Sequence, residues 1–379
     1  MDTALCLLRG LDLSGSQTPG GVAGKRPPQR FRSLLYFVLS AAYFLLAEQV
    51  AGSAANGLSS GEWKELVYRC VLLFLLLAGF WAMGYVFQRQ RTPLKSMGLI
   101  RRKTALREFG VGAAFGWGGM TASVLPIAIF GGMTITFWTG PKQFGLLLLD
   151  LAILLVAALA EEVAFRGYPF QRLIEAMGPT MATLVVSAIF ALEHLANPDA
   201  TLASTLVTVL AGWLLALAYL RTRALWLPWG LHFAWNASMG ALFGLPVSGL
   251  RIFSPVVSTN AHGPIWLTGD GYGPEGGLVT ALVLLVGLGV LTRITRDYAY
   301  DYAQPAIIPG GIPVDIAAAA RRQHEQAMAS PAEAAAPRLV QILPSGGGAA
   351  PEATPAAVVE EKPLQEGGGP GASLPIGER

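Results

Sequence analysis

The chain has 379 residues, of which 53% are hydrophobic and 13% are charged, and its mean hydropathy is +0.49. Soluble domains carry roughly 25% charged residues, so this composition excludes an ordinary soluble domain and indicates a membrane protein. The formal net charge is only +3 and the basic residues gather in a few loops, so we expect no nucleic-acid partner.

The first 30 residues carry basic side chains but no long apolar core followed by a small-residue cleavage site. A cleaved signal peptide requires both of those features. Lys25, Arg26, Arg30 and Arg32 stand just before or at the start of the first apolar run, which is the pattern of a cytoplasmic flank. We therefore predict that residues 1–30 form a cytoplasmic N-terminal segment.

Eight apolar runs follow that could cross about 30 Å of hydrocarbon, the shorter ones with help from flanking residues. The fourth is expected to continue past its apolar part into "EEVAFRGYPFQRLIEAM". The runs predict an all-α, polytopic membrane bundle of about eight transmembrane helices within residues 31–300. They lie near residues 33–50, 66–87, 109–130, 145–160, 180–195, 202–220, 225–244 and 277–292.

The third span contains "FGVGAAFGWGGM", in which Gly112 and Gly116 are four residues apart. Small residues at this spacing let two membrane helices approach closely. The sequence therefore predicts that this span packs tightly against another helix.

The loops between spans alternate between basic and nearly uncharged. Because cytoplasmic loops carry an excess of lysine and arginine, we predict an even number of crossings, with both termini and the loop 88–107 in the cytoplasm. The loop 246–276 should lie across the membrane, and the membrane is expected to be the cytoplasmic one. The basic loop residues are Arg89, Arg91, Lys95, Arg101, Arg102, Lys103, Arg107, Arg166, Arg172, Arg221, Arg223, Arg293 and Arg296.

Beyond the last span the composition changes to alanine, proline and glycine with scattered charge. Such a segment cannot bury enough apolar surface to offset its ordering entropy. We predict a disordered cytoplasmic tail over residues 301–379.

Ionisable residues inside the spans are costly and by default indicate a functional site. In "EEVAFRGYPFQRL" the spacing of Glu162 and Arg166 is i, i+4, which places them on one helix face where they can form an ion pair. Glu161 lies about 100° around the helix and is left free for another partner.

Two further polar sets follow on later spans: Phe190 and His194 in "FALEH", and His232 and Asn236 in "LHFAWN", each at i, i+4. A turn at Gly178, followed by a proline, lies almost midway between Glu161 and His194, so both return to the same depth at about 1.5 Å per residue. We therefore expect Glu161 and His194 to meet inside the bundle. The same counting places His232 at a depth in the bundle that differs by roughly 10 Å from that of Glu161 and His194.

These motifs carry a resemblance. "EEVAFRGYPFQRL", "FALEHLANP" and "LWLPWGLHFAWNAS" resemble the three motifs of the CPBP family, the CAAX protease and bacteriocin-processing group also called Abi. The pattern E-E-x-x-x-R, F-x-x-x-H and H-x-x-x-N is specific as a set, and the similarity covers a core of about residues 145–245.

The resemblance implies an intramembrane protease that hydrolyses peptide bonds in a helix bundle with a cytoplasm-facing cavity. Glu161 and His194 would activate water, and His232 and Asn236 would form the oxyanion hole. Glu162, Arg166 and Phe190 would support the site. The substrate is expected to be a peptide or protein in or at the lipid bilayer.

The acid–base and hydrogen-bonding properties of these side chains fit the roles. A carboxylate in a low-dielectric cavity can take a proton from water and return it to the leaving amine. Two donors on one helical turn can stabilise the charge on the carbonyl oxygen by ~3 kcal/mol each.

A zinc-dependent form of the protease is the alternative mechanism, with Glu161, His194 and His232 as ligands. The chain has no H-E-x-x-H motif, and Asn236 has a clear role only in the metal-free mechanism. We therefore expect no cofactor, with zinc as the alternative.

Two other classes of function remain open. A transporter also keeps charged residues at the middle of the membrane, although usually with internal repeats, and none is evident here. A non-catalytic scaffold or bacteriocin-immunity-like protein with an inert site would have the same sequence pattern.

Overall fold

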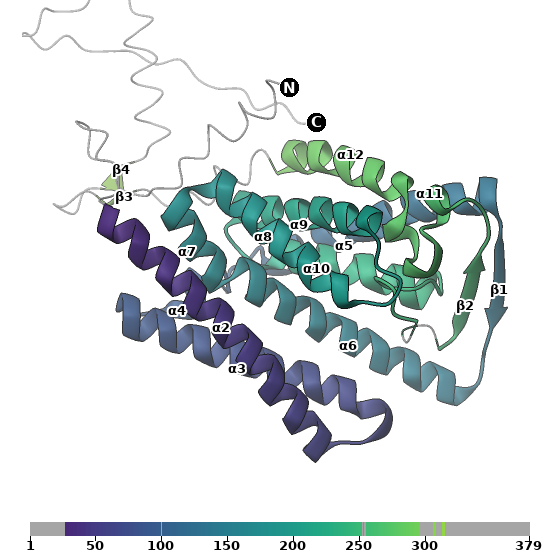
Figure 1. Ribbon diagram of the computed structural model, residues 1–379, viewed down its shortest axis with the longest axis horizontal. Coiled ribbons are helices and arrows are strands. Elements are labelled where there is room, and N and C mark those ends of the chain that lie inside the picture. The colour runs from purple at the N-terminus through teal and green to yellow at the C-terminus, as the bar shows by residue number, and fades with distance from the viewer. Residues whose placement is uncertain are drawn as a thin grey trace, which may run out of the picture. The chain divides into compact units, whose positions relative to one another are not determined.

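The computed structural model describes residues 27–99, 101–251, 253, 255–295, 306–307 and 313–314. Each of the eight predicted spans corresponds to a helix (Figure 1), so the predicted helix bundle is confirmed. The spans correspond to α2 (Pro27–Leu58), α3 (Lys64–Gln88), α5 (Ala105–Pro126), α6 (Pro141–Arg166), α8 (Pro179–Glu193), α9 (Leu202–Thr222), α10 (Trp226–Ala237) and α12 (Leu278–Ile294).

Among the described residues, six helical segments are long and apolar enough to cross a membrane. They contain α2, α3, α5, α6 with α7 (Tyr168–Met177), α8 and α9. The helices α10 and α12 are shorter, with 12 and 17 residues. Many large apolar side chains on α2 and α3 are exposed, as expected where lipid covers a helix. The protein is therefore an integral membrane protein.

Short elements join these helices. They are η1 (Gly61–Trp63), α4 (Pro93–Ser96), the π-helical η2 (Ile127–Gly131) and η4 (Ser238–Leu242), η3 (His194–Ala196), α11 (Ile265–Thr268), η5 (Asp270–Tyr272) and η6 (Pro274–Gly276). Two strands that the sequence analysis did not predict, β1 (Met133–Phe137) and β2 (Val257–Ala261), pair antiparallel.

The termini lie largely beyond the described residues. The predicted segment 1–30 overlaps the structure only at residues 27–30, which already belong to α2. The predicted tail, residues 301–379, falls outside the described residues except for one short antiparallel pair, β3 (Ala306–Ile307) with β4 (Pro313–Val314).

The predicted continuation of the fourth span is present, but it is interrupted at Gly167. Gly167 has ψ −128°, outside the helical range, and Pro169 follows at the start of α7. Proline lacks an N–H and its ring clashes with the preceding helical turn, so α6 stops at Arg166. The short helix α7 then packs against α2 and α8, burying Tyr168, Phe170 and Leu173.

The predicted close packing of the third span is confirmed, with α10 as its partner. A Cβ added at Gly112 would lie 2.1 Å from the carbonyl oxygen of Leu227, and one at Gly116 would lie 2.2 Å from that of Leu231. A Cβ at Gly230 would lie 2.1 Å from the carbonyl oxygen of Phe109. The backbones of α5 and α10 are therefore in direct contact, and this contact fixes the position of α10.

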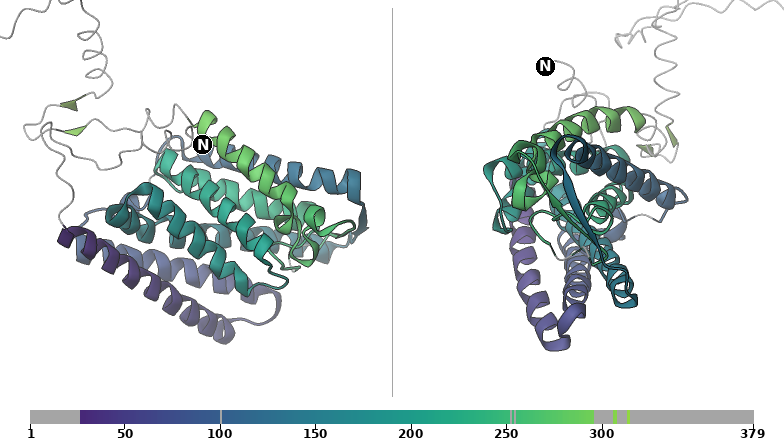
Figure 2. Two further views of the ribbon diagram at one scale, coloured as in Figure 1. Left: turned by 45° about the horizontal axis from the view of Figure 1, so that its top comes forward. Right: turned by 90° about the vertical axis from the view of Figure 1, so that its right-hand side faces the viewer.

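The helices alternate in direction, so their ends gather at two opposite ends of the bundle (Figures 1 and 2). At the end we call the basic end, Ser33 at the start of α2 donates to Glu175 of α7 at 2.9 Å. At the same end Arg102 donates to the carbonyl oxygen of Thr222 at 3.2 Å, and Arg221 donates to that of Thr292 at 3.2 Å.

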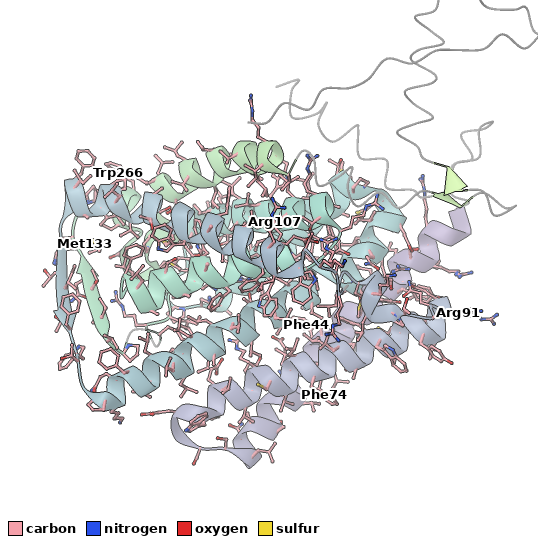
Figure 3. All side chains as sticks on the ribbon, turned by 180° about the vertical axis from the view of Figure 1, so that it is seen from behind. Phe44, Phe74, Arg91, Arg107, Met133 and Trp266 are labelled. Atoms are coloured by element: carbon pink, nitrogen blue, oxygen red, sulfur yellow. The ribbon has the colours of Figure 1, made fainter. Side chains whose placement is uncertain are left out.

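The opposite end, which we call the loop end, contains β1, β2 and the described residues of the segments 195–201, 244–251 and 255–277. Figure 3 shows Met133 and Trp266 at this end and Arg91 at the other. Lys142 at the start of α6 pairs with Glu62 of η1 at 3.3 Å, and Asn197 donates to the carbonyl oxygen of Ser248 at 3.0 Å.

Candidate active site

The residues predicted to do the chemistry lie around one cavity of about 210 Å³. Glu161 reaches it from α6, His194 from the end of α8, and His232 and Asn236 from α10. Glu161 and His194, which were expected to meet inside the bundle, both line this cavity. His232 lines the same cavity, although counting along ideal helices left it out of level with them.

A fully buried ion pair supports the cavity wall. Nη1 of Arg166 lies 3.2 Å from Oε1 of Glu162, as the i, i+4 spacing predicted. Nη2 of Arg166 donates to the carbonyl oxygen of Gly212 at 3.2 Å, and its guanidinium stacks 4.6 Å from the ring centre of Phe190. Because removing one partner of a buried pair costs several kcal/mol, ~3 to 5, this pair holds α6, α8 and α9 in register.

Glu162 also positions His232. Nδ1 of His232 lies 2.8 Å from Oε1 of Glu162, and a buried carboxylate accepts a hydrogen bond, so Nδ1 carries the proton. Nε2 of His232 lies 3.6 Å from Oε2 of Glu161, which is longer than a hydrogen bond. The ring is therefore oriented by Glu162, and its second nitrogen is not committed to Glu161.

His194 has a defined tautomer as well. Its Nδ1 lies 2.8 Å from the carbonyl oxygen of Phe190, and a carbonyl only accepts, so Nδ1–H is the donor. Its ring centre lies 4.5 Å from that of Phe190, which in turn packs edge-on against Phe165 at 5.2 Å. In a neutral His194 the lone pair is then on Nε2, where it can accept a hydrogen bond from water.

Asn236 lies one helical turn after His232 and lines the same cavity. Among the hydrogen bonds of the described residues its side chain has none, so its amide is available to a ligand. One residue earlier, Trp235 donates from Nε1 to Oε1 of Glu275 at 2.8 Å, which fixes this turn of α10.

Glu275 is one of the cavity residues that the sequence analysis missed. Its Oε2 accepts from the backbone N–H of Ser248 at 3.0 Å and from the Ser248 hydroxyl at 2.6 Å. This carboxylate therefore ties the segment 244–277 to α10. The one signal for it in the sequence is a looser similarity to the CPBP family through the stretch "GPEGGL" at residues 273–278.

Arg69 is the second such residue. It lies on α3, and its Nη1 is 3.7 Å from Oε1 of Glu161 while its Nε donates to Glu65 at 2.7 Å. Glu48, Tyr68 and Glu193 also line the cavity. The rule that an ionisable residue inside a span indicates function applies to Arg69 as it does to Glu161, so the signal was present within the span 66–87.

The zinc alternative would require Glu161, His194 and His232 to converge on one ion. Within the part of the chain that the structure describes, no three His, Cys, Asp or Glu side chains come together closely enough to hold a metal ion. Glu161, His194 and His232 share the cavity, but they do not form such a group.

The cavity lies toward the loop end of the bundle. Its lining includes Asn197, Val247, Ser248 and Glu275, all from segments at that end. The charges of the loops predicted that the loop 246–276 lies across the membrane from the termini, whereas the family resemblance implied a cytoplasm-facing cavity. Because this loop lines the cavity, these two expectations are incompatible.

Comparison with known proteins agrees with the geometry. Residues 141–238 match the family model described as Type II CAAX prenyl endopeptidase Rce1-like, a stretch that runs from α6 to the end of α10 and contains every predicted site residue. No curated protein and no solved structure matches the chain. Through residues 141–238, the chain is therefore similar to the CAAX-type endopeptidases of the CPBP family.

Proposed function

We propose that the protein is an intramembrane endopeptidase that hydrolyses peptide bonds of membrane-associated or membrane-delivered peptides. The observation that carries this proposal is the arrangement of Glu161, His194, His232 and Asn236 around one cavity. The family match supports the reaction class. The side chains supply a base, a group that binds water, and two hydrogen-bond donors.

The reaction begins with a water molecule held between Glu161 and Nε2 of His194. Glu161 takes one proton from the water as the water oxygen attacks the carbonyl carbon of the substrate. The charge that develops on the carbonyl oxygen is stabilised by N–H donors from His232 and Asn236. Glu161 then returns the proton to the leaving nitrogen, the C–N bond breaks, and the products are a new carboxyl group and a new amine.

The hydrogen bond between His232 and Glu162 sets a condition on this mechanism. Since Nδ1–H is already donated to Glu162, His232 offers a second N–H, at Nε2, only when the ring carries both protons. The carboxylate of Glu162 compensates the positive charge of that form. Glu162 therefore acts as a positioning residue, and Arg166 holds Glu162 in turn.

We favour metal-free hydrolysis over the zinc alternative. The described residues lack a converging set of three metal-ligating side chains, and the free amide of Asn236 has a function only as an oxyanion donor. No cofactor is part of the proposed mechanism.

We further propose that the basic end lies in the cytoplasm and that the membrane is the cytoplasmic one. Apart from Arg69 in the cavity, the basic residues that the structure describes toward the loop end are Lys64, Lys142 and Arg251. Cytoplasmic loops carry the excess of basic residues, so the cavity would be reached from the opposite side. The basic end has Arg30, Arg32, Arg89, Arg91, Lys95, Arg101, Arg102, Lys103, Arg107, Arg172, Arg221, Arg223 and Arg293.

Comparative peptidomics tests the function in cells that express the wild-type protein or Glu161→Ala. We expect a set of peptides that is present with wild type and absent with Glu161→Ala. Glu62→Ala is the matched control, because Glu62 is an exposed acid at the loop end that does not line the cavity. Identical peptide profiles for wild type and Glu161→Ala would instead favour a non-catalytic scaffold or a transporter.

A further inference from the structure

A second cavity, which we call the basic groove, lies at the basic end and is separate from the candidate active site. It is formed where the start of α2, the end of α3 and α7 meet, and its volume is about 890 Å³. The side chains that determine its chemistry come from three helices. They are Arg32 and Tyr36 of α2, Phe87 of α3 with Arg89 directly after it, and Arg172 and Glu175 of α7.

The charge balance of the basic groove is positive. Three arginines face one carboxylate, because Glu175 accepts from Nη1 of Arg172 at 2.8 Å and from the hydroxyl of Ser33 at 2.9 Å. The side chain of Arg172 is buried and its Nε has no hydrogen-bond partner among the described residues. Arg32 and Arg89 are exposed at the rim, and no interaction within the described residues neutralises them.

The shape of the basic groove is fixed by packing rather than by its charges. The rings of Tyr36 and Phe87 stack with centres 5.2 Å apart and an interplanar angle of 4°. Gln88 at the end of α3 donates to the hydroxyl of Tyr168 on α7 at 3.1 Å. The two rim arginines are therefore held on helices that are already joined, so a ligand between them does not have to bring the helices together.

The surroundings distinguish a lipid from a soluble anion. Val86 and Phe87 of α3, which line the basic groove, are exposed large apolar residues, and so are Leu35 and Val38, which flank Tyr36 in the sequence of α2. A lipid would place its phosphate between the arginines and its acyl chains along these side chains. Basic pockets between transmembrane helices on the cytoplasmic side are recognised sites for anionic headgroups.

We propose that the basic groove binds the phosphate group of an anionic membrane lipid. The site is independent of peptide hydrolysis, because none of its residues lines the candidate active-site cavity.

Native mass spectrometry of the purified full chain tests this proposal. The protein is mixed with equal amounts of phosphatidylglycerol and phosphatidylcholine that have the same acyl chains. We expect the wild type to retain phosphatidylglycerol preferentially, and the double variant Arg32→Gln, Arg89→Gln to lose that preference by about fivefold for each arginine. The buried Arg172 is left unchanged so that Glu175 keeps its partner.

The matched control is the double variant Arg91→Gln, Arg107→Gln, which removes the same charge from residues outside the basic groove, one just after α3 and one in the first turn of α5. An equal loss of preference in this control would overturn the proposal, because it would show general attraction rather than a site. A parallel arm adds inorganic phosphate or glycerol 3-phosphate. Displacement of the lipid by either at equal concentration would show a site for soluble phosphate instead.

Discussion

The carboxylate of Glu161 lies between two basic groups that come from different helices. Its Oε2 is 3.6 Å from Nε2 of His232 on α10, and its Oε1 is 3.7 Å from Nη1 of Arg69 on α3. The family match begins at residue 141, so Arg69 is a contribution of this chain's own N-terminal half to the site. Since Arg69 touches Glu161 and is itself held by Glu65, we assign it as a positioning residue.

This assignment predicts the behaviour of Arg69→Met. The variant should lower kcat by roughly 10- to 100-fold, the effect of a misplaced catalytic group, with a smaller change in KM. Arg69→Lys should recover part of the loss. Combined with Glu161→Gln, Arg69→Met should cause no further loss, because it acts through Glu161. A full additional loss in the double variant would contradict the assignment. Lys64→Met, which removes a charge at an exposed position of α3 away from the cavity, is the control and should leave kcat unchanged.

Asn236 and His232 separate the two mechanisms. If Asn236 donates to the oxyanion, Asn236→Ala should lower kcat by roughly 10² to 10³ with little change in KM. His232→Gln, which retains a donor, should keep residual activity. A mild effect of Asn236→Ala together with complete loss in His232→Gln would point to zinc, since losing a ligand typically empties a metal site.

At the scale of elements, the contact between α5 and α10 sets the position of the proposed oxyanion hole. We predict that Gly112→Ala destabilises the protein by roughly 1 to 3 kcal/mol, because the added methyl group meets the backbone of Leu227, as in other overpacked sites. Thermal unfolding in detergent measures the change. Gly110→Ala is the matched control, since a Cβ there meets nothing within 4 Å. Equal melting temperatures would show that α5 and α10 are not in close contact.

The sequence could predict the elements whose signals are local. The apolar runs locate the eight helices, the Gly112 and Gly116 spacing indicates close packing, and the i, i+4 spacing pairs Glu162 with Arg166. It could not place His232 level with Glu161, because that depends on how α10 packs on α5. It could not predict β1 and β2 either, since residues 133–137 and 257–261 pair across more than a hundred intervening residues.

At the scale of the whole molecule, the distribution of charge predicts the orientation in the membrane. The two cysteines of the chain, Cys6 and Cys70, are first replaced by serine so that they do not react. Arg251→Cys at the loop end should then react with an impermeant thiol reagent in intact cells. Arg91→Cys at the basic end (Figure 3) should react only after permeabilisation. The reverse pattern would place the cavity on the cytoplasmic side, as the family resemblance implied, and would leave the proposed chemistry unchanged.

The most direct test of the central claim uses purified protein and a peptide substrate identified by the cell experiment. Peptide cleavage is measured for wild type and Glu161→Gln, before and after prolonged chelation, and zinc is determined in the same samples. We predict that the wild type cleaves after chelation without stoichiometric zinc, and that Glu161→Gln is at least about 10³-fold slower, as for loss of an essential base. Undiminished cleavage by Glu161→Gln, or one zinc ion per chain that is lost and restored together with activity, would contradict this account.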